Sequence, residues 1–501
     1  MKVVLDRLAR ERTTLCGPVA HSIALAGKRG RRQWLAVRFS IPPRDILQDF
    51  VCSRNSAAFY WQQPSCEVSI LGLGRLATIE GRGPDRFHEA SLAARDLFAN
   101  LELFDLEDAN FTNGSGDRTP QRGPLLLGGF AFSDRGVDDG SEWRTLGAGR
   151  LVLPEVGVVI RQGEAWLTRS CFIDPGDRIE EVLDRVCKVG REYASQTPAE
   201  AEISLPQIRG DFEFVDEREE AGLEIRVQTD RPHSRYLAQV EAARDAIDAG
   251  KFEKVVLARS LRVRADHDFD LASFLSVLRE TYPSCTTLAV RERDCWFISA
   301  TPEKLVALAR QRVTTAAVAG SAPRGRSQAE ETLHSSRLLE SDKERAEHEV
   351  VERSIRSALS ETCGWLEGPA SPGLLKLEGI QHLETPLHGS LLSKWRGRLG
   401  VLDLVAALHP TPAVGGAPRS PALDWLDQHE ELDRGWYAGP VGHVDAHGDG
   451  EFRVALRSGL LRARCARLFA GAGIVSSSEP KRELAETRLK LRALLAPLTE
   501  I

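Results

Sequence analysis

Residues 468–490, LFAGAGIVSSSEPKRELAETRLK, determine how the rest of the chain is interpreted. The segment begins with an apolar run typical of a strand, which ends in residues 470–473 (AGAG), whose small size lets a backbone approach a ligand closely. We expect a turn there, in which peptide N–H groups hold an anion. A helix should follow, with Ser478 as its N-cap and Pro480 in its first turn.

Two carboxylates of this predicted helix, Glu483 and Glu486, lie three residues apart on one face. They would repel an anion held by the preceding residues unless a cation lay between them. The segment therefore predicts a divalent metal ion beside an anionic ligand.

A second pair of glutamates with the same spacing, Glu344 and Glu347, lies in a long charged helix predicted at residues 336–360. Either pair alone has a simpler interpretation as a solvated helix face. Mg²⁺ prefers oxygen ligands, keeps several waters and often binds one or two carboxylates together with an anionic group of the substrate. We expect one glutamate of each pair to bind Mg²⁺ and the other to hold its waters.

The composition is that of a soluble globular protein, with 42% hydrophobic and 28% charged residues in a chain of 501. The net charge of −6 gives no reason to expect nucleic acid as a partner. No apolar run has the length of a signal peptide or of a membrane span, so we expect a cytoplasmic protein without a membrane partner. Nine cysteines without a CxxC pair predict reduced thiols rather than disulfides or a zinc site.

The alternation of apolar and polar residues predicts many strands, several of them without a helix in between. This arrangement favours an α+β fold with large antiparallel sheets flanked by helices over a doubly wound sheet. Helices are predicted at residues 85–102, 235–249, 271–282, 336–360, 402–408 and 421–430. Strands are predicted at residues 33–39, 66–73, 124–132, 150–161, 165–172, 254–264, 286–291, 295–300, 305–308, 314–319, 374–383 and 389–392, and an exposed loop at residues 112–123.

An acid and a base are suggested by Glu303 and Lys254. Lys254 begins a strand-like apolar run; it is either a surface lysine or a base whose pKa, ordinarily near 10.4, is lowered by desolvation or by cationic neighbours. Glu303 lies in a proline turn, ATPE, and would be a general acid if an apolar pocket raised its pKa.

Several further residues are candidates for binding the ligand. Arg457 interrupts an apolar strand, VALR, and a guanidinium there needs a carboxylate of the protein or of a ligand. Lys490 lies one turn beyond Glu486 and would serve the same purpose. Residues 409–416, HPTPAVGG, form a rigid loop suited to a pocket wall. His382 and His409 are either catalytic or structural.

Nine motifs in this order and spacing resemble the chorismate-utilising enzymes, a family that includes isochorismate, salicylate, anthranilate and aminodeoxychorismate synthases. The resemblance is strong over about residues 230–495 and extends loosely to the first half through LLLGGFAF at residues 125–132. The motifs are KVVLAR, ATPEKLV, AGSAPRG, SDKERAEHE, HPTPAVGG, DRGWYAGPVG, EFRVALRSG, AGAGIV and ELAETRLK.

The resemblance implies one large fold with two pseudo-symmetric α/β halves, dependence on Mg²⁺ and chorismate as the substrate. We divide the chain into residues 1–225, a divergent N-terminal half of the fold, and residues 226–501, the chorismate-binding catalytic region. The family also implies a monomer. A scaffold that keeps the fold without catalysis is the alternative of another class, but every expected polar residue is present.

Three positions bear on the reaction within this family. Lys254 stands where amine-adding members carry Gln, so water is the expected nucleophile and no glutamine amidotransferase partner is expected. Ala319 stands where aminodeoxychorismate synthases carry a nucleophilic lysine, which argues against covalent addition. Ala413 stands where pyruvate-eliminating members carry Thr. The resemblance is therefore closest to isochorismate synthases of menaquinone or siderophore biosynthesis, with salicylate synthase as the alternative.

The family's residue roles carry over to matching positions of this chain. Lys254 would activate water and Glu303 would protonate the departing hydroxyl, while Glu347 and Glu486 bind Mg²⁺ and Glu344 and Glu483 hold its waters. The expected substrate-binding residues are Arg457, Tyr437, Gly473, Lys490, Ala413, Ser321 and His382. His443 replaces a Trp that is common after GPVG.

Overall fold

The computed structural model describes residues 7–192 and 225–499, except residues 9, 54, 109, 114–120, 136 and 138–139. Most of the predicted loop at residues 112–123 therefore lies outside the described residues. The helices are α2 (Arg12–Arg29), α3 (Ile46–Cys52), α4 (Arg86–Ala99), α5 (Ile179–Glu192), α6 (His233–Asp248), α7 (Leu271–Thr281), α8 (Gln328–Glu340), α9 (Asp342–Leu359), α10 (Val401–Leu408), α11 (Arg419–His429) and α12 (Pro480–Thr499).

The described strands form two sheets, of 14 and 10 strands, which are antiparallel except for the pairing of β1 with β5. The larger sheet has the order β11 (Ile225–Thr229), β12 (Lys254–Ala265), β24 (Cys465–Ile474), β23 (Ser458–Arg462), β14 (Cys295–Thr301), β13 (Thr286–Glu292), β2 (Ala57–Gln63), β3 (Val68–Leu73), β9 (Val156–Arg161), β10 (Glu164–Ile173), β1 (Gln33–Ile41), β5 (Leu101–Asp105) and β6 (Asn110–Asn113), with β20 (Gly416–Ala417) beside β12. The smaller sheet has the order β17 (Cys363–Glu367), β19 (Ile380–Leu391), β16 (Arg312–Pro323), β15 (Lys304–Ala309), β22 (Gly450–Val454), β21 (Pro440–Asp445), β7 (Leu125–Phe130), β8 (Gly149–Leu153) and β4 (Ala77–Glu80), with β18 (Gly373–Lys376) beside β19.

The strand order of the larger sheet is pseudo-symmetric about its centre, where β13 pairs with β2. On one side, β12 pairs with β24 and β14 with β23; on the other, β1 pairs with β10 and β3 with β9. The helices repeat in the same way: α6 precedes β12 as α2 precedes β1, and α12 follows β24 as α5 follows β10. The predicted α+β fold with two pseudo-symmetric halves is confirmed.

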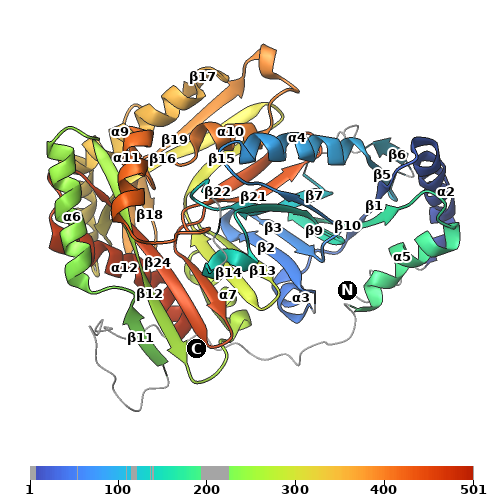
Figure 1. The fold of residues 1–501 in the computed structure, drawn as a ribbon, viewed down its shortest axis with the longest axis horizontal. Coiled ribbons are helices and arrows are strands. Elements are labelled where there is room, and N and C mark those ends of the chain that lie inside the picture. The colour runs from blue at the N-terminus through green and yellow to red at the C-terminus, as the bar shows by residue number, and fades with distance from the viewer. Residues whose placement is uncertain are drawn as a thin grey trace.

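Both sheets contain strands from each side of residue 225, so the described halves share their hydrogen-bonded scaffold. Figure 1 shows the later half around α6, α9 and α12 and the earlier half around α2 and α5, with the sheets running between them. One apolar core lies between the two sheets and a second lies between the larger sheet and α2, α3, α5, α7 and α12. The division of the chain at residue 225 into a divergent N-terminal half and a catalytic region stays a prediction.

Three predicted elements are each divided in two. Residues 374–383 form β18 and the start of β19, because the chain turns between them at Gly379, which has a φ of 74°. Residues 150–161 form β8 and β9 in different sheets, because Pro154 lies between them and has no N–H to donate to a ladder. The helix predicted at residues 336–360 is wrong: α8 ends at Glu340 and α9 begins at Asp342. Ser341 between them has an extended backbone and its Oγ accepts a hydrogen bond from the Glu344 N–H at 3.4 Å.

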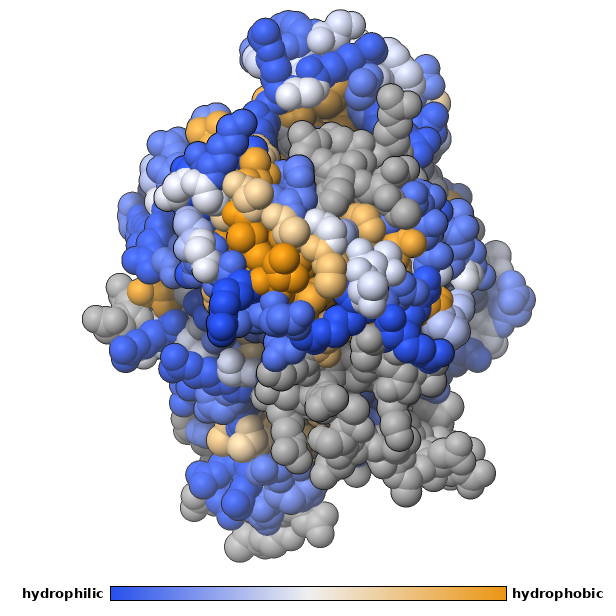
Figure 2. Space-filling view, turned by 90° about the vertical axis from the view of Figure 1, so that its right-hand side faces the viewer, coloured by the Kyte–Doolittle hydropathy of each residue, from blue (hydrophilic) through white to orange (hydrophobic). Residues whose placement is uncertain are grey.

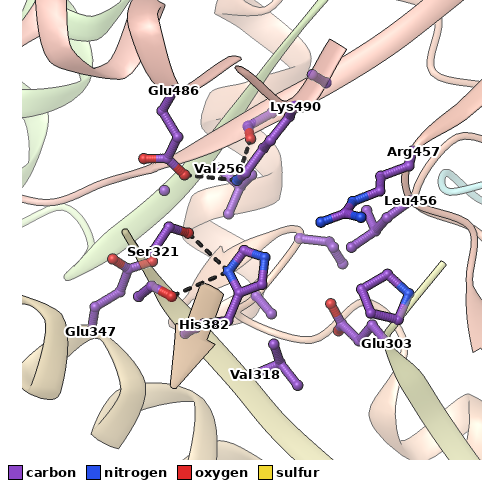
Figure 3. A pocket seen from close by; sticks show the side chains of 18 of the residues that line it. Val256, Glu303, Val318, Ser321, Glu347, His382, Leu456, Arg457, Glu486 and Lys490 are labelled. Atoms are coloured by element: carbon purple, nitrogen blue, oxygen red, sulfur yellow. Dashed lines mark hydrogen bonds and ion pairs between the residues drawn. The ribbon is translucent and has the colours of Figure 1, made fainter. Parts of the chain in front are cut away.

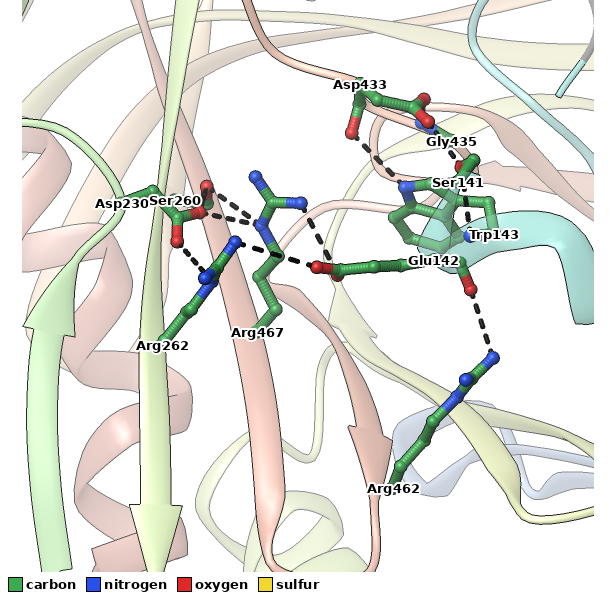
Figure 4. A network of polar contacts seen from close by, with 10 residues as sticks. All are labelled: Ser141, Glu142, Trp143, Asp230, Ser260, Arg262, Asp433, Gly435, Arg462 and Arg467. Carbon is green, nitrogen blue, oxygen red and sulfur yellow. Dashed lines mark hydrogen bonds and ion pairs between the residues drawn. The ribbon is translucent and has the colours of Figure 1, made fainter. Parts of the chain in front are cut away.

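A polar network ties the earlier half to the later half (Figure 4). The carboxylate of Glu142 lies 3.4 Å from Arg467 of β24 and 3.8 Å from Arg262 of β12. Asp230 pairs with both arginines at 2.7 Å, and the Trp143 indole donates to the carbonyl of Asp433 at 3.2 Å. These contacts hold the 3₁₀ helix at residues 142–145 against β12, β24 and the loop before Trp436.

The face shown in Figure 2 is mostly hydrophilic, with one apolar patch near its centre. In the part of the chain that the structure describes, none of the helices has the length and apolar character needed to span a bilayer. The nine cysteines are all free, as the sequence predicts.

Candidate active site

A cavity of roughly 790 Å³ of empty space, part of it open to solvent, lies among β12, β16, β24, α9 and α12. Figure 3 shows Glu347 and Glu486 on one side of it, Glu303 and Arg457 on the other, and His382 between them. Most of the predicted site residues line this cavity, although they come from distant parts of the chain. They are Glu303, Ser321, Glu347, His382, Ala413, Tyr437, Arg457, Gly473, Glu486 and Lys490.

The predicted base, Lys254, is the first residue of β12 and its side chain is 1% exposed. Its ammonium lies 2.8 Å from Oε1 of Glu347, so it is tied to a residue of the cavity wall. The alternative of a surface lysine is excluded. Gly473 makes room for this pair, because a Cβ there would lie 2.5 Å from Oε1 of Glu347 and 3.0 Å from Cε of Lys254.

Substituting Gly473→Ala is therefore expected to displace the Lys254–Glu347 pair and to lower the kcat of the reaction at this site by about a hundredfold, since a misplacement of about 1 Å costs that much in catalysis. The matched control is Gly157→Ala in β9, where an added Cβ would meet its nearest atom only at 3.8 Å. Steady-state kinetics and thermal melting of both variants provide the test. Full activity of Gly473→Ala would contradict this role for the glycine.

The four glutamates predicted for the metal lie in the N-terminal parts of α9 and α12. Glu486 lies 2.7 Å from the ammonium of Lys490, which also donates to the Gly471 carbonyl at 2.9 Å. Glu344 accepts from the backbone N–H of Ser321 at 3.0 Å. Glu483 lies 3.3 Å from Lys343. Glu344, Glu483 and Lys254 thus stand directly behind the cavity wall.

The charges of these carboxylates influence one another. Burial and then the neighbouring Glu347 raise the pKa of Glu344, and burial and then Glu486 raise the pKa of Glu483. Burial also disfavours the ionised form of Glu486, but the Lys490 ammonium outweighs it and lowers the pKa of Glu486. Positive charge, here that of Lys490 beside Glu486, relieves the repulsion among these carboxylates.

The donor set fits a hard cation in its chemistry, because all four side chains offer carboxylate oxygen. Glu486 of α12 adds to the repulsion that raises the pKa of Glu344 on α9, so acidic groups of the two helices act on one another. Among the described residues, however, no three His, Cys, Asp or Glu side chains converge in the arrangement of a metal cluster. Lysines hold Glu347, Glu483 and Glu486 here, so carboxylate movement would accompany ion binding.

The predicted acid, Glu303, lies between β14 and β15 and is 5% exposed. Burial raises the pKa of Glu303 to about 7, although Lys254 and Lys490 act in the opposite direction. Val318, Leu456 and Pro302 are apolar residues that line the same cavity as Glu303. A carboxyl with this pKa is partly protonated at neutral pH and is able to donate a proton there.

Arg457 differs from its prediction in local structure, because it lies in the connection between β22 and β23 with a φ of 45° rather than within a strand. Its guanidinium lies over the ring of Tyr282, 5.3 Å from the ring centre. Its Nη1 is buried and has no hydrogen-bond partner in the described structure. An unused guanidinium donor on the wall of a cavity is suited to an anionic group of a ligand.

His382 and Ser321 face the cavity from β19 and β16. Nδ1 of His382 lies 3.2 Å from the Gly320 carbonyl, which only accepts, so Nδ1 carries the hydrogen and Nε2 is the acceptor. Ser321 Oγ lies 3.0 Å from the same nitrogen. Burial, with Lys490 and Arg457, lowers the pKa of His382 to about 3, so this ring is neutral. His409 contacts the Phe132 carbonyl at 3.1 Å and does not line the cavity.

The turn expected at residues 470–473 is wrong. These residues are part of β24, and residues 471–473 pair with 256–258 of β12, because their backbone groups complete the ladder. Their small side chains still form a cavity wall, as expected. Ser478 also differs from its prediction as an N-cap, since its Oγ accepts from the Val475 N–H at 3.1 Å and α12 begins at Pro480.

The sequence does not predict a buried ion pair, Glu430 with Arg434, that supports the cavity wall from behind. Arg434 donates to the carbonyls of Val256 at 2.6 Å and Val414 at 2.8 Å, and both of these residues line the cavity. Glu430 pairs with Arg434 at 2.5 Å and also accepts from the Ala258 N–H at 2.9 Å. The only sequence signal is the i, i+4 spacing of Glu430 and Arg434, which does not reveal what they hold.

Two further groups were missed. Lys343 neutralises Glu483, and its only sequence signal is its place beside Glu344 in SDKERAEHE. The apolar lining, which includes Phe469 stacked on Tyr437 at 5.4 Å between ring centres, has no local signal beyond strand periodicity.

Comparisons with known proteins identify the family and agree with the fold. The family model described as chorismate binding enzyme matches residues 21–499. A salicylate biosynthesis isochorismate synthase of Pseudomonas aeruginosa is 34% identical over 495 residues, covering 97% of this chain and 94% of that protein. Isochorismate synthase MenF of Bacillus subtilis is 32% identical over 440 residues, covering 88% and 87%.

A solved structure, that of the menaquinone-specific isochorismate synthase MenF from Escherichia coli, has the same fold, with a TM-score of 0.74 at 22% identity, covering 95% of this chain and 100% of that one. The family model spans nearly the whole chain, and the residues that carried the resemblance meet at one cavity. The chain therefore belongs to the chorismate binding enzyme family.

Proposed function

We propose that this protein is an isochorismate synthase, which converts chorismate into isochorismate by adding water at ring carbon 2 and releasing the hydroxyl at carbon 4. The observation that carries the proposal is a buried carboxyl on the cavity wall, Glu303, whose pKa is about 7, across the cavity from Glu347, which pairs with the buried Lys254 behind that wall (Figure 3). Relatives named isochorismate synthase support it.

In the proposed reaction, the neutral amine of Lys254 takes a proton from water, whose oxygen forms a bond to carbon 2. The ring double bonds shift, the bond from carbon 4 to its oxygen breaks, and Glu303 protonates the departing hydroxyl, which leaves as water. No covalent bond to the enzyme is formed. Ala413 on the cavity wall offers no hydroxyl, which supports a reaction that stops before pyruvate is eliminated.

The substrate is proposed to bind with its enolpyruvyl carboxylate on Arg457, whose Nη1 is available, near Tyr437 and Gly473. Lys490 adds positive charge, and neutral His382 with Ser321 offers an acceptor and a hydroxyl to the ring substituents. Positioning and charge stabilisation then supply most of the rate.

We propose Mg²⁺ as the cofactor, held by Glu347 and Glu486, with Glu344 and Glu483 supporting its waters. When bound, it would supply positive charge to the ring carboxylate and balance the charge of Glu347, which lies 2.8 Å from Lys254. The protein is further proposed to act in the cytoplasm, as a monomer and without a glutamine amidotransferase.

Incubating the purified protein with chorismate and Mg²⁺ and separating the products by chromatography tests the proposed function. Isochorismate is the expected product. Salicylate together with pyruvate would show a salicylate synthase instead, and no turnover at saturating Mg²⁺ would show a protein that keeps the fold without the activity.

Glu486→Gln is expected to raise the Mg²⁺ concentration needed for half-maximal activity by at least about tenfold, because it removes a charged ligand. An interaction with a charged group contributes about 1.5–3 kcal/mol, which corresponds to a change of at least about tenfold in affinity. A Mg²⁺ titration of the activity measures it. The control is Glu479→Gln at the exposed start of the same region, which should titrate as the wild type. An unchanged requirement in Glu486→Gln would exclude Glu486 as a ligand.

A further inference from the structure

A second cavity lies between the two sheets and shares no lining residue with the candidate active site. It encloses roughly 420 Å³ of empty space, part of it open to solvent. Its walls come from β2, β3 and β13 of the larger sheet and from β7 and β8 of the smaller sheet. Apolar side chains dominate these walls, among them Phe59, Leu127, Val152, Val290 and Trp436.

Charged side chains gather at one part of this cavity. Arg150 donates to Oε2 of Glu292 at 2.7 Å, and Arg75 pairs with the same oxygen. Two guanidinium groups thus share one carboxylate, which leaves one positive charge. Nε of Arg150 is buried and has no hydrogen-bond partner in the described structure.

The other carboxylates near this charge have partners of their own. Glu80, which acts on Arg150 electrostatically, pairs with Arg82 at 2.8 Å, and Glu155, beside Gly74 of the wall, lies 4.0 Å from Arg169. The combination of apolar walls and an unused, charged donor is typical of pockets for small ligands with one anionic group. A phosphate fits this cavity less well, because its charge exceeds that of the one guanidinium left unbalanced. It also has no apolar part to pack against the walls.

We propose that this cavity is a second ligand site, which binds a small monocarboxylic acid with an apolar body about the size of one ring. The carboxylate accepts hydrogen bonds from Arg150, and the body packs against Phe59, Val290 and Trp436. The proposal does not depend on the reaction at the active site.

Two residues that are adjacent in sequence line different cavities: Trp436 lines the second cavity and Tyr437 lines the candidate active site. The active site also has an arginine, Arg457, with an available donor. A test must therefore distinguish the two sites, as well as measure binding.

Isothermal titration calorimetry of the full chain with benzoate tests the proposal, with benzamide as the uncharged probe of the same shape. We expect benzoate to bind with a 1:1 stoichiometry and more tightly than benzamide. Arg150→Met should weaken benzoate binding by about tenfold or more, through loss of a charge-assisted hydrogen bond. Glu292 keeps Arg75 as its partner in this variant, and thermal melting checks its fold.

Val290→Phe is the second variant, because it fills the cavity while leaving Arg150 intact. It should weaken benzoate binding by about tenfold or more, whereas Arg457→Met should bind benzoate as the wild type does. No binding to the wild-type chain, equal affinity for benzamide, or wild-type binding in Val290→Phe would each overturn the proposal. Loss of binding in Arg457→Met alone would assign benzoate to the active site and also overturn it.

Discussion

Replacing Lys254 by alanine is expected to lower kcat for chorismate by a factor of about 10²–10⁴, the usual contribution of a positioned general base. Lys254 is buried at the start of β12 with its ammonium 2.8 Å from Glu347, which lines the same cavity as the predicted acid, Glu303. Chorismate should still bind, because the role of Lys254 is proton transfer and Arg457 remains. Stopped-flow or calorimetric binding, measured beside steady-state kinetics, separates the two effects.

Lys251→Ala is the matched control, since Lys251 is exposed three residues before Lys254. It should keep wild-type activity. Near-full activity in Lys254→Ala would show that another group activates the water. Loss of chorismate binding in step with kcat would instead give Lys254 a binding role.

Replacing Glu303 by glutamine is expected to lower kcat by a similar factor of about 10²–10⁴, because the amide cannot donate the proton that the leaving hydroxyl needs. The wild-type activity should fall as the pH rises above about 7, where Glu303 loses its proton. The kcat profile is measured between pH 5.5 and 9. A flat alkaline limb in the wild type would exclude Glu303 as the acid.

The thermal stability of the protein gives a second test of the protonation of Glu303. Burial raises the pKa of Glu303 from 4.5 to about 7, so the folded state binds the proton more tightly than the unfolded state. The stabilisation from this proton is complete below pH 4.5 and is lost as the pH rises through 7. Glu303→Gln should therefore melt at a higher temperature than the wild type at pH 8, and the difference should shrink at pH 5. The opposite trend would contradict a protonated, buried carboxyl.

The sequence predicts the fold class well, because strand periodicity survives in nearly every predicted strand of both halves. It fails where a single residue redirects the chain. Ser341 satisfies the N–H of Glu344 with its own hydroxyl and starts a new helix, and Pro154 moves the chain from one sheet to the other. The small residues at 470–473 permit a turn, but pairing with the strand β12 decides their conformation.

The predicted site residues were recovered through motifs, and the cavity gathers most of them. Their partners were not recoverable, because an ion pair such as Lys254 with Glu347 joins residues that are far apart in the chain. The same holds for Arg434, which supports Val256 and Val414 through carbonyl groups that every residue carries. Local patterns identify which side chains carry chemistry, whereas the groups that position and neutralise them depend on the fold.

Turnover of chorismate in ¹⁸O-labelled water with Mg²⁺, followed by mass spectrometry of the product, tests the central claim most directly. The account predicts isochorismate that carries one ¹⁸O at carbon 2, because water supplies that oxygen and the hydroxyl of carbon 4 departs. Unlabelled isochorismate, or salicylate with pyruvate as the products, would contradict it.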